Sequence, residues 1–70
     1  MTKEQWGTFI SVTKGMIKKE EDHLKYLKNK QHISNDVPYY TLLEDAIHRS
    51  EQYLSHYELR LFQYETEFNN

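Results

Sequence analysis

The chain has no cysteine, one proline and only two glycines among its 70 residues. Without cysteine it can form neither a disulfide nor a thiolate metal site, which often stabilise domains of this size. With so few helix-breaking residues, long uninterrupted helices are the expected structure. A chain this short buries only about 60% of its unfolded surface, so we expect self-association to add to a small core.

Long apolar runs are also missing. No segment approaches the roughly 20 apolar residues that span a bilayer, and the start MTKEQWGTF lacks the features of a secretory signal. We therefore expect a cytoplasmic protein with no membrane partner. Gly7 and Gly15 cannot make a phosphate-binding loop, and no serine or threonine has a convincing histidine and acid partner. We expect no enzymatic activity, no cofactor and no small-molecule substrate.

The charges are divided unequally along the chain. Residues 1–32 hold seven lysines and four acids, whereas residues 33–70 hold two arginines and seven acids. A nucleic-acid-binding protein usually keeps a basic stripe after folding, but here the basic half should lie against the acidic half. We therefore do not expect binding to DNA or RNA.

One segment interrupts the helical pattern. The stretch QHISNDVPYY contains the only proline, Pro38, which disfavours helix at the residue before it. The sequence thus predicts a single domain with a helix at about 2–30, a turn at 31–39 and a second helix at about 40–68. Thr2 with Gln5 fits a capping box at the first helix, and either Asp36 or Thr41 caps the second.

Apolar residues recur at alternating spacings of three and four, which defines a heptad seam along each predicted helix. In the second helix the seam consists of Tyr40, Leu43, Ile47, Ser50, Leu54, Tyr57, Leu61, Tyr64 and Phe68. In the first helix it consists of Trp6, Ile10, Thr13, Ile17, Glu20, Leu24 and Leu27. This pattern predicts an all-α fold, an antiparallel two-helix hairpin that resembles a coiled coil.

The two flanks of this seam differ in chemistry. In an antiparallel register Lys14 falls near Glu58 and Lys28 near Glu44, which predicts one charged flank. The other flank is largely apolar and would stay exposed in a monomer. We expect it to form a homodimer interface in a four-helix bundle. The predicted interface residues are Phe9, Met16, His23, Ala46 and Tyr53.

A second group of residues lies near the C-terminus. Leu59 and Phe62 lie off the seam and have no evident internal partner, although isolated exposed apolar residues are common. Aromatic residues and arginine often dominate protein interfaces, so we predict a binding site for a target protein here. The predicted contacts are Tyr57, Leu59, Arg60, Phe62 and Tyr64. Burial of Tyr57 and Tyr64 in the seam would explain those two equally well.

Glu20 and His23 are the only suggestive metal ligands. Their spacing of three residues occurs in di-iron helical bundles, but those sites also need an inward glutamate on the facing helix, where this chain has Ser50. We therefore favour a polar layer in which Glu20, His23 and Ser50 hydrogen-bond and fix the register, and we expect no bound metal.

These features together favour a small interaction protein, a dimeric inhibitor or adaptor that binds and modulates a larger protein of unknown identity. Short helical regulators encoded by phages and other mobile elements fit this description. One alternative is a structural subunit of a larger helical oligomer. A second alternative is a metal-binding helical bundle that uses Glu20 and His23.

Overall fold

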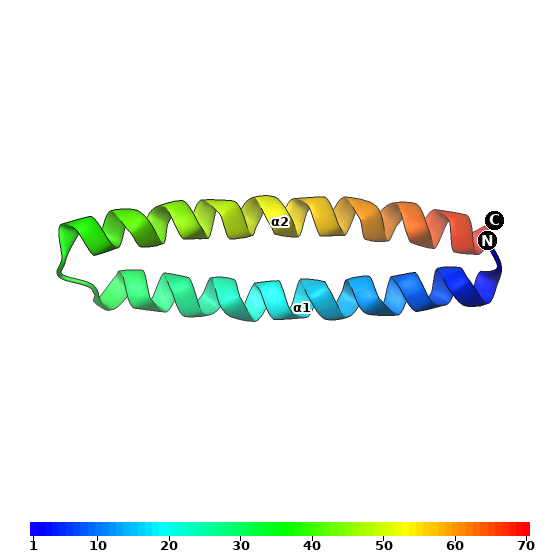
Figure 1. Ribbon diagram of the computed structural model, residues 1–70, viewed down its shortest axis with the longest axis horizontal. Helices are drawn as coiled ribbons and strands as arrows, with labels where there is room; N and C mark the ends of the chain where they lie inside the picture. The colour runs from blue at the N-terminus through cyan, green and yellow to red at the C-terminus, as the bar shows by residue number, and fades with distance from the viewer.

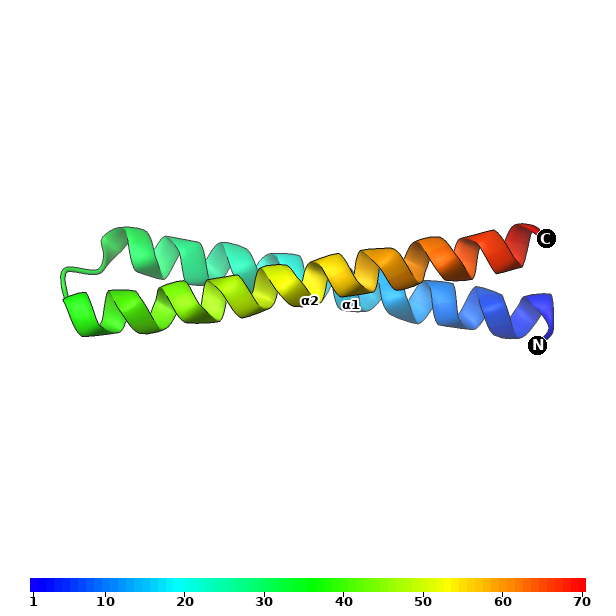
Figure 2. The same ribbon diagram turned by 90° about the horizontal axis from the view of Figure 1, so that it is seen from above.

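The computed structural model describes residues 1–70 as two α-helices packed side by side in opposite directions (Figure 1). Helix α1 covers Lys3–Ile33 and helix α2 covers Val37–Asn69, and residues 34–36 join them. Both termini lie at the same end of the molecule (Figure 1). Figure 2 shows the helices crossing near the middle of their length, as in a coiled coil. The predicted all-α hairpin is confirmed.

The two predicted capping patterns explain where the helices begin. The Thr2 N–H donates to Gln5 Oε1 at 3.0 Å and the Gln5 N–H donates to Thr2 Oγ1 at 3.2 Å, which completes the capping box. At α2 the Asp36 carboxylate accepts from the Tyr39 N–H at 3.2 Å. Asp36, and not Thr41, is therefore the cap of the second helix.

The turn is shorter than the predicted 31–39. Helix α1 continues to Ile33, and the Ser34 N–H then donates to the Gln31 carbonyl at 3.3 Å. Helix α2 already begins at Val37 and takes Pro38 into its first turn. Proline is tolerated there because the N–H groups of a first helical turn have no intrahelical acceptor. Helix α1 thus ends three residues later than predicted. Helix α2 begins three residues earlier than predicted, because Pro38 occupies its first turn instead of delaying it.

Burial follows the predicted seam. Six residues are buried, and all of them occupy seam positions: Thr13, Ile17, Leu27, Leu43, Ile47 and Ser50. The apolar cluster of Leu27, Leu43 and Ile47 lies toward the turn, where Leu24 and Ala46 pack against it. The predicted heptad seam is therefore the packing seam of the structure, except that its end members Tyr40 and Phe68 are 43% and 37% exposed.

Three aromatic rings close the opposite end of the hairpin. The ring centroids of Trp6 and Tyr64 lie 5.7 Å apart, and those of Phe9 and Tyr64 lie 5.8 Å apart. Trp6 and Phe9 also meet edge to face at 6.3 Å. Rings at such separations attract each other beyond simple burial, so this aromatic cluster joins α1 and α2 near the chain ends.

The hairpin is far more extended than a compact domain. Its radius of gyration is 15.9 Å, whereas a compact chain of 70 residues has about 11 Å. Its accessible surface is 5604 Å², whereas a compact monomer of 8.6 kDa exposes roughly 4,700 Å². The elongated hairpin therefore exposes roughly 900 Å² more than a compact chain of the same mass.

Candidate interaction surfaces

Most of the exposed large apolar side chains lie on one broad side of the hairpin. They directly precede the two seam positions of the heptad and so form two adjacent rows along one flank of each helix. In an antiparallel pair these flanks of the two helices lie on the same side. We call this side the apolar face. Its exposed members are Phe9, Val12, Met16, Tyr26, Ile33, Tyr39, Leu42 and Tyr53. These are eight of the fourteen exposed large apolar residues, so the exposure is not scattered.

The five predicted dimer-interface residues all fall on the apolar face. His23, Ala46 and Tyr53 line one hollow at its middle. Met16 is 40% exposed and flanks the seam on the same side. Phe9 is 41% exposed although its ring contacts Trp6 and Tyr64, so it belongs both to the aromatic cluster and to this face.

The predicted interface omitted five exposed members of the apolar face, namely Val12, Tyr26, Ile33, Tyr39 and Leu42. Apart from Tyr39, they are more exposed than Phe9, Met16 and Tyr53, between 56% for Val12 and 68% for Leu42. The signal was present in the spacing, because residues three apart are neighbours on a helical surface. Val12 follows Phe9 by three residues and Leu42 follows Tyr39 by three, which would have revealed the second row.

A polar pair lies beneath the middle of the apolar face. Ser50 is only 2% exposed and donates its hydroxyl hydrogen to Glu20 Oε1 at 2.7 Å. This confirms the Glu20–Ser50 part of the predicted polar layer. His23 lines the hollow beside them but is exposed and hydrogen-bonds to neither. No three histidine, aspartate or glutamate side chains lie close enough together to hold a metal ion.

The rim of this hollow carries a fixed positive charge. Arg49 lines the hollow and forms an ion pair with Asp45 one turn earlier on α2. The hydrogen bond and the charge of Asp45 raise the pKa of Arg49, which stays protonated at any ordinary pH. This is the one ion pair in the structure, so neither Lys14 with Glu58 nor Lys28 with Glu44 pairs across the charged flank. Exposed pairs of long side chains gain little from a single geometry, which explains why they stay apart.

The predicted contacts near the C-terminus divide into two groups. Tyr57 and Tyr64 are half-buried in the seam, and Tyr64 belongs to the aromatic cluster. Arg60 is exposed at the edge of the apolar face. Leu59 and Phe62 are 57% and 70% exposed and lie away from that face. The side chains of Leu59 and Phe62 are therefore exposed enough to contact another molecule, whereas those of Tyr57 and Tyr64 pack within the hairpin.

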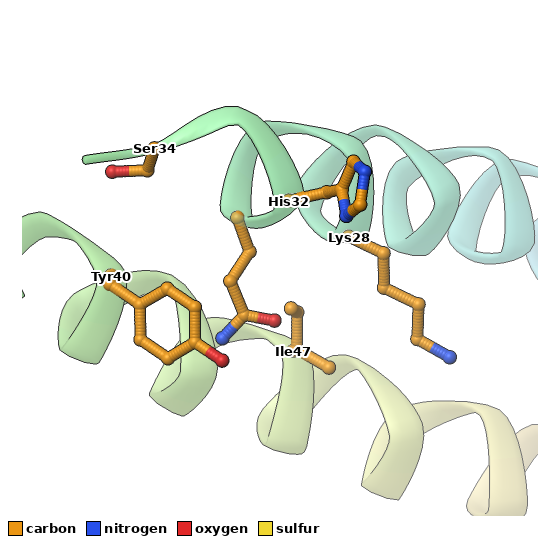
Figure 3. A pocket seen from close by; sticks show the side chains of 6 residues that line it. Lys28, His32, Ser34, Tyr40 and Ile47 are labelled. Atoms are coloured by element: carbon orange, nitrogen blue, oxygen red, sulfur yellow. The ribbon is translucent and has the colours of Figure 1, made fainter.

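The largest hollow lies beside the turn and has a volume of about 440 Å³. Lys28, Gln31, His32 and Ser34 line it from the α1 side, and Tyr40 and Ile47 line it from α2. Figure 3 shows the Lys28 side chain extending away from Tyr40, and the His32 ring stays close to α1. These polar groups do not converge on one point, so we place no ligand there.

Comparisons with known proteins give no relative. No protein-family model matches the chain, and neither a curated protein nor a solved structure matches it. Neither helix contains a stretch that is long and apolar enough to cross a membrane. What the protein does must therefore be inferred from the surfaces of the hairpin.

Proposed function

We propose that this protein is a non-enzymatic interaction module, a dimeric inhibitor or adaptor that binds and modulates a larger protein. Two hairpins pack their apolar faces together about a twofold axis and form an antiparallel four-helix bundle. The observation on which this rests is the concentration of eight exposed large apolar side chains on one face of a hairpin with only four buried apolar residues.

The size of the apolar face supports a dimer. The molecule extends 51 Å along its axis and 14 Å across it, so one broad face measures roughly 700 Å² from the product of these lengths. Stable interfaces bury about 800 Å² on each partner. The roughly 900 Å² by which the hairpin exceeds a compact monomer is of the same size. Covering the apolar face once would thus remove most of the excess.

The chemistry of the apolar face also suits association between copies. Dimer interfaces are rich in aromatic residues and methionine, and this face contains Met16 and the tyrosines Tyr26, Tyr39 and Tyr53. The dimer would add a second apolar layer to the small core of each hairpin. Leu59 and Phe62 would remain accessible in two symmetric copies, which supports binding to a further protein.

A structural role is the second candidate, and the charged flank favours it. Helix α2 carries glutamates at a strict interval of seven residues, Glu44, Glu51, Glu58 and Glu65, and none of them forms an ion pair. Lys14, Lys18, Lys25 and Lys28 lie on the same flank of α1, where Glu21 interrupts them. A row of glutamates on α2 beside lysines on α1 could attract the opposite charges of neighbouring hairpins. Growth of the particle beyond a dimer at low salt would support this candidate.

The dependence of the melting temperature on protein concentration tests the dimer. If folding and association are coupled, the melting temperature rises over a roughly hundredfold increase in concentration. Tyr53→Glu places a charge on the apolar face and should abolish this rise while the helices still form. Gln52→Glu adds the same charge at a neighbouring exposed position off the face and should leave the rise unchanged. A wild-type melting temperature that does not change with concentration would contradict the dimer.

A further inference from the structure

A second apolar surface lies at the open end of the hairpin, near the chain termini. Phe62 is 70% exposed and Leu59 is 57% exposed, and both lie on α2. By helical position Phe62 points to the broad side opposite the apolar face, next to Glu58 and Glu65. A partner that covers the apolar face would therefore leave Phe62 accessible.

A hollow lies on the same broad side of the hairpin, close to the chain termini. It has a volume of about 270 Å³ and is lined by Gly7, Ile10 and Lys14 of α1 and by Glu65, Phe68 and Asn69 of α2. Gly7 has no side chain, and a Cβ there would come within 3.7 Å of the Phe68 ring. Such a contact is of ordinary van der Waals length, so Gly7 contributes only its backbone to the wall beside the half-buried Ile10. Glu65, which lines the hollow, lies three residues after Phe62 on the same side of α2.

The part of this surface that α2 contributes is negatively charged. Glu58 and Glu65 flank Phe62 at four residues before it and three residues after it, and neither forms an ion pair. Residues 51–70 hold four glutamates and a single arginine. Lys14 is the one cation that lines the hollow. A ligand of this surface should therefore combine apolar groups with positive charge.

We propose that Leu59, Phe62 and the hollow bind a basic amphipathic helix of another protein, and this inference rests on the proposed function as an inhibitor or adaptor. Apolar side chains of such a helix would contact Phe62 and enter the hollow, as in other helix-in-groove complexes. Lysine or arginine residues beside them would face Glu58 and Glu65. An anionic lipid surface would be repelled by the same glutamates.

The binding of a model helix tests this proposal. The probe is a fluorescein-labelled 18-residue peptide of leucine and lysine, with leucines at helical spacings of three and four, measured by fluorescence anisotropy. Phe62→Ser should weaken binding by about tenfold or more, as expected for the loss of a central interface residue. Glu58→Gln with Glu65→Gln should weaken it several-fold and reduce its salt dependence, because fewer charges then contribute. Lys14→Gln should strengthen it.

Two controls separate this inference from the dimer. Val12→Ser lies on the apolar face and should weaken self-association without changing peptide binding. A peptide of leucine and glutamate with the same spacing should not bind. Equal binding of the lysine peptide to wild type and Phe62→Ser, or its loss in Val12→Ser instead, would overturn the proposed site even if the dimer stands. Tight binding to anionic vesicles without peptide binding would assign the surface to lipid and would also overturn it.

Discussion

At the scale of single residues, the least exposed side chain of the protein is the polar Ser50. Its hydroxyl group is satisfied by Glu20, whose carboxylate reaches into the seam from the other helix. Burying polar atoms costs free energy unless they are hydrogen-bonded, so the pair is tolerated because each group has a partner. It also disfavours slipped registers, in which Glu20 would face an apolar layer instead of Ser50.

Removing one member of this pair should cost more than removing both. Ser50→Ala leaves the Glu20 carboxylate without its donor and should lower the free energy of unfolding by about 1 kcal/mol. Glu20→Leu combined with Ser50→Ala replaces the layer with apolar groups and should exceed the wild-type stability by about 1 kcal/mol. Urea denaturation followed by circular dichroism measures both variants. If the double variant is less stable than Ser50→Ala, the pair must contribute more to the stability of the fold than the satisfaction of each other's hydrogen-bonding groups.

Gly15 is the weakest point in the interior of α1. A Cβ placed there meets no atom within 4 Å, and the residue is exposed. Gly15→Ala should therefore raise the free energy of unfolding by about 1 kcal/mol, because alanine has the higher helix propensity. Thermal unfolding at fixed protein concentration gives the value. A loss of stability would show that another molecule packs closely against this side of α1.

The sequence predicted which residues are buried more reliably than it predicted which are exposed together. Thr13 and Ser50 were placed in the seam because the heptad period fixes a position whatever its polarity, and both are buried. Val12 and Leu42 were not predicted because a heptad repeat identifies only the residues that face the other helix. A second stripe on the outside becomes visible only when the rows of both helices are combined.

At the scale of the helices, the aromatic cluster of Trp6, Phe9 and Tyr64 joins the free ends. The cluster of Leu27, Leu43 and Ile47 lies toward the turn, where the chain itself joins α1 and α2. The aromatic cluster has no such covalent support. It should therefore decide whether the ends of the two helices fray.

Tyr64→Ala tests this role. The substitution removes the ring that contacts both Trp6 and Phe9 and should lower the free energy of unfolding by about 2 kcal/mol, since the ring is half-buried. Trp6 is the only tryptophan, so its emission reports this end alone and should shift to longer wavelength in the folded variant. Phe62→Ala removes a ring of the same helix that is 70% exposed and should change stability by less than about 0.5 kcal/mol. Unchanged tryptophan emission in Tyr64→Ala would contradict the assigned role.

The helix boundaries near the turn show where sequence reasoning reaches its limit. Pro38 disfavours helix at the preceding residue and also suits a first helical turn, so the same residue gives two conflicting signals. The hydrogen bond from the Tyr39 N–H to Asp36 decides between them in the structure. The side-chain oxygen of Asp36 starts the helix early enough to include Pro38.

At the scale of the whole molecule, the hairpin has two broad sides of different chemistry. One is the apolar face and the other holds the glutamates of α2 opposite lysines of α1. The sequence predicted this difference because the flanks of a seam can be assigned once the helices are antiparallel. The predicted pairs of Lys14 with Glu58 and Lys28 with Glu44 did not form, because exposed charges are screened and their side chains are free to move.

The most direct test of self-association through the apolar face is the molar mass in solution, measured by light scattering after size exclusion over a roughly hundredfold range of concentration. The proposed dimer gives twice the chain mass of 8.6 kDa at high concentration, and Tyr53→Glu gives the mass of a single chain. A wild-type protein that stays at 8.6 kDa throughout would contradict the dimer and leave the apolar face as a binding site for a different protein.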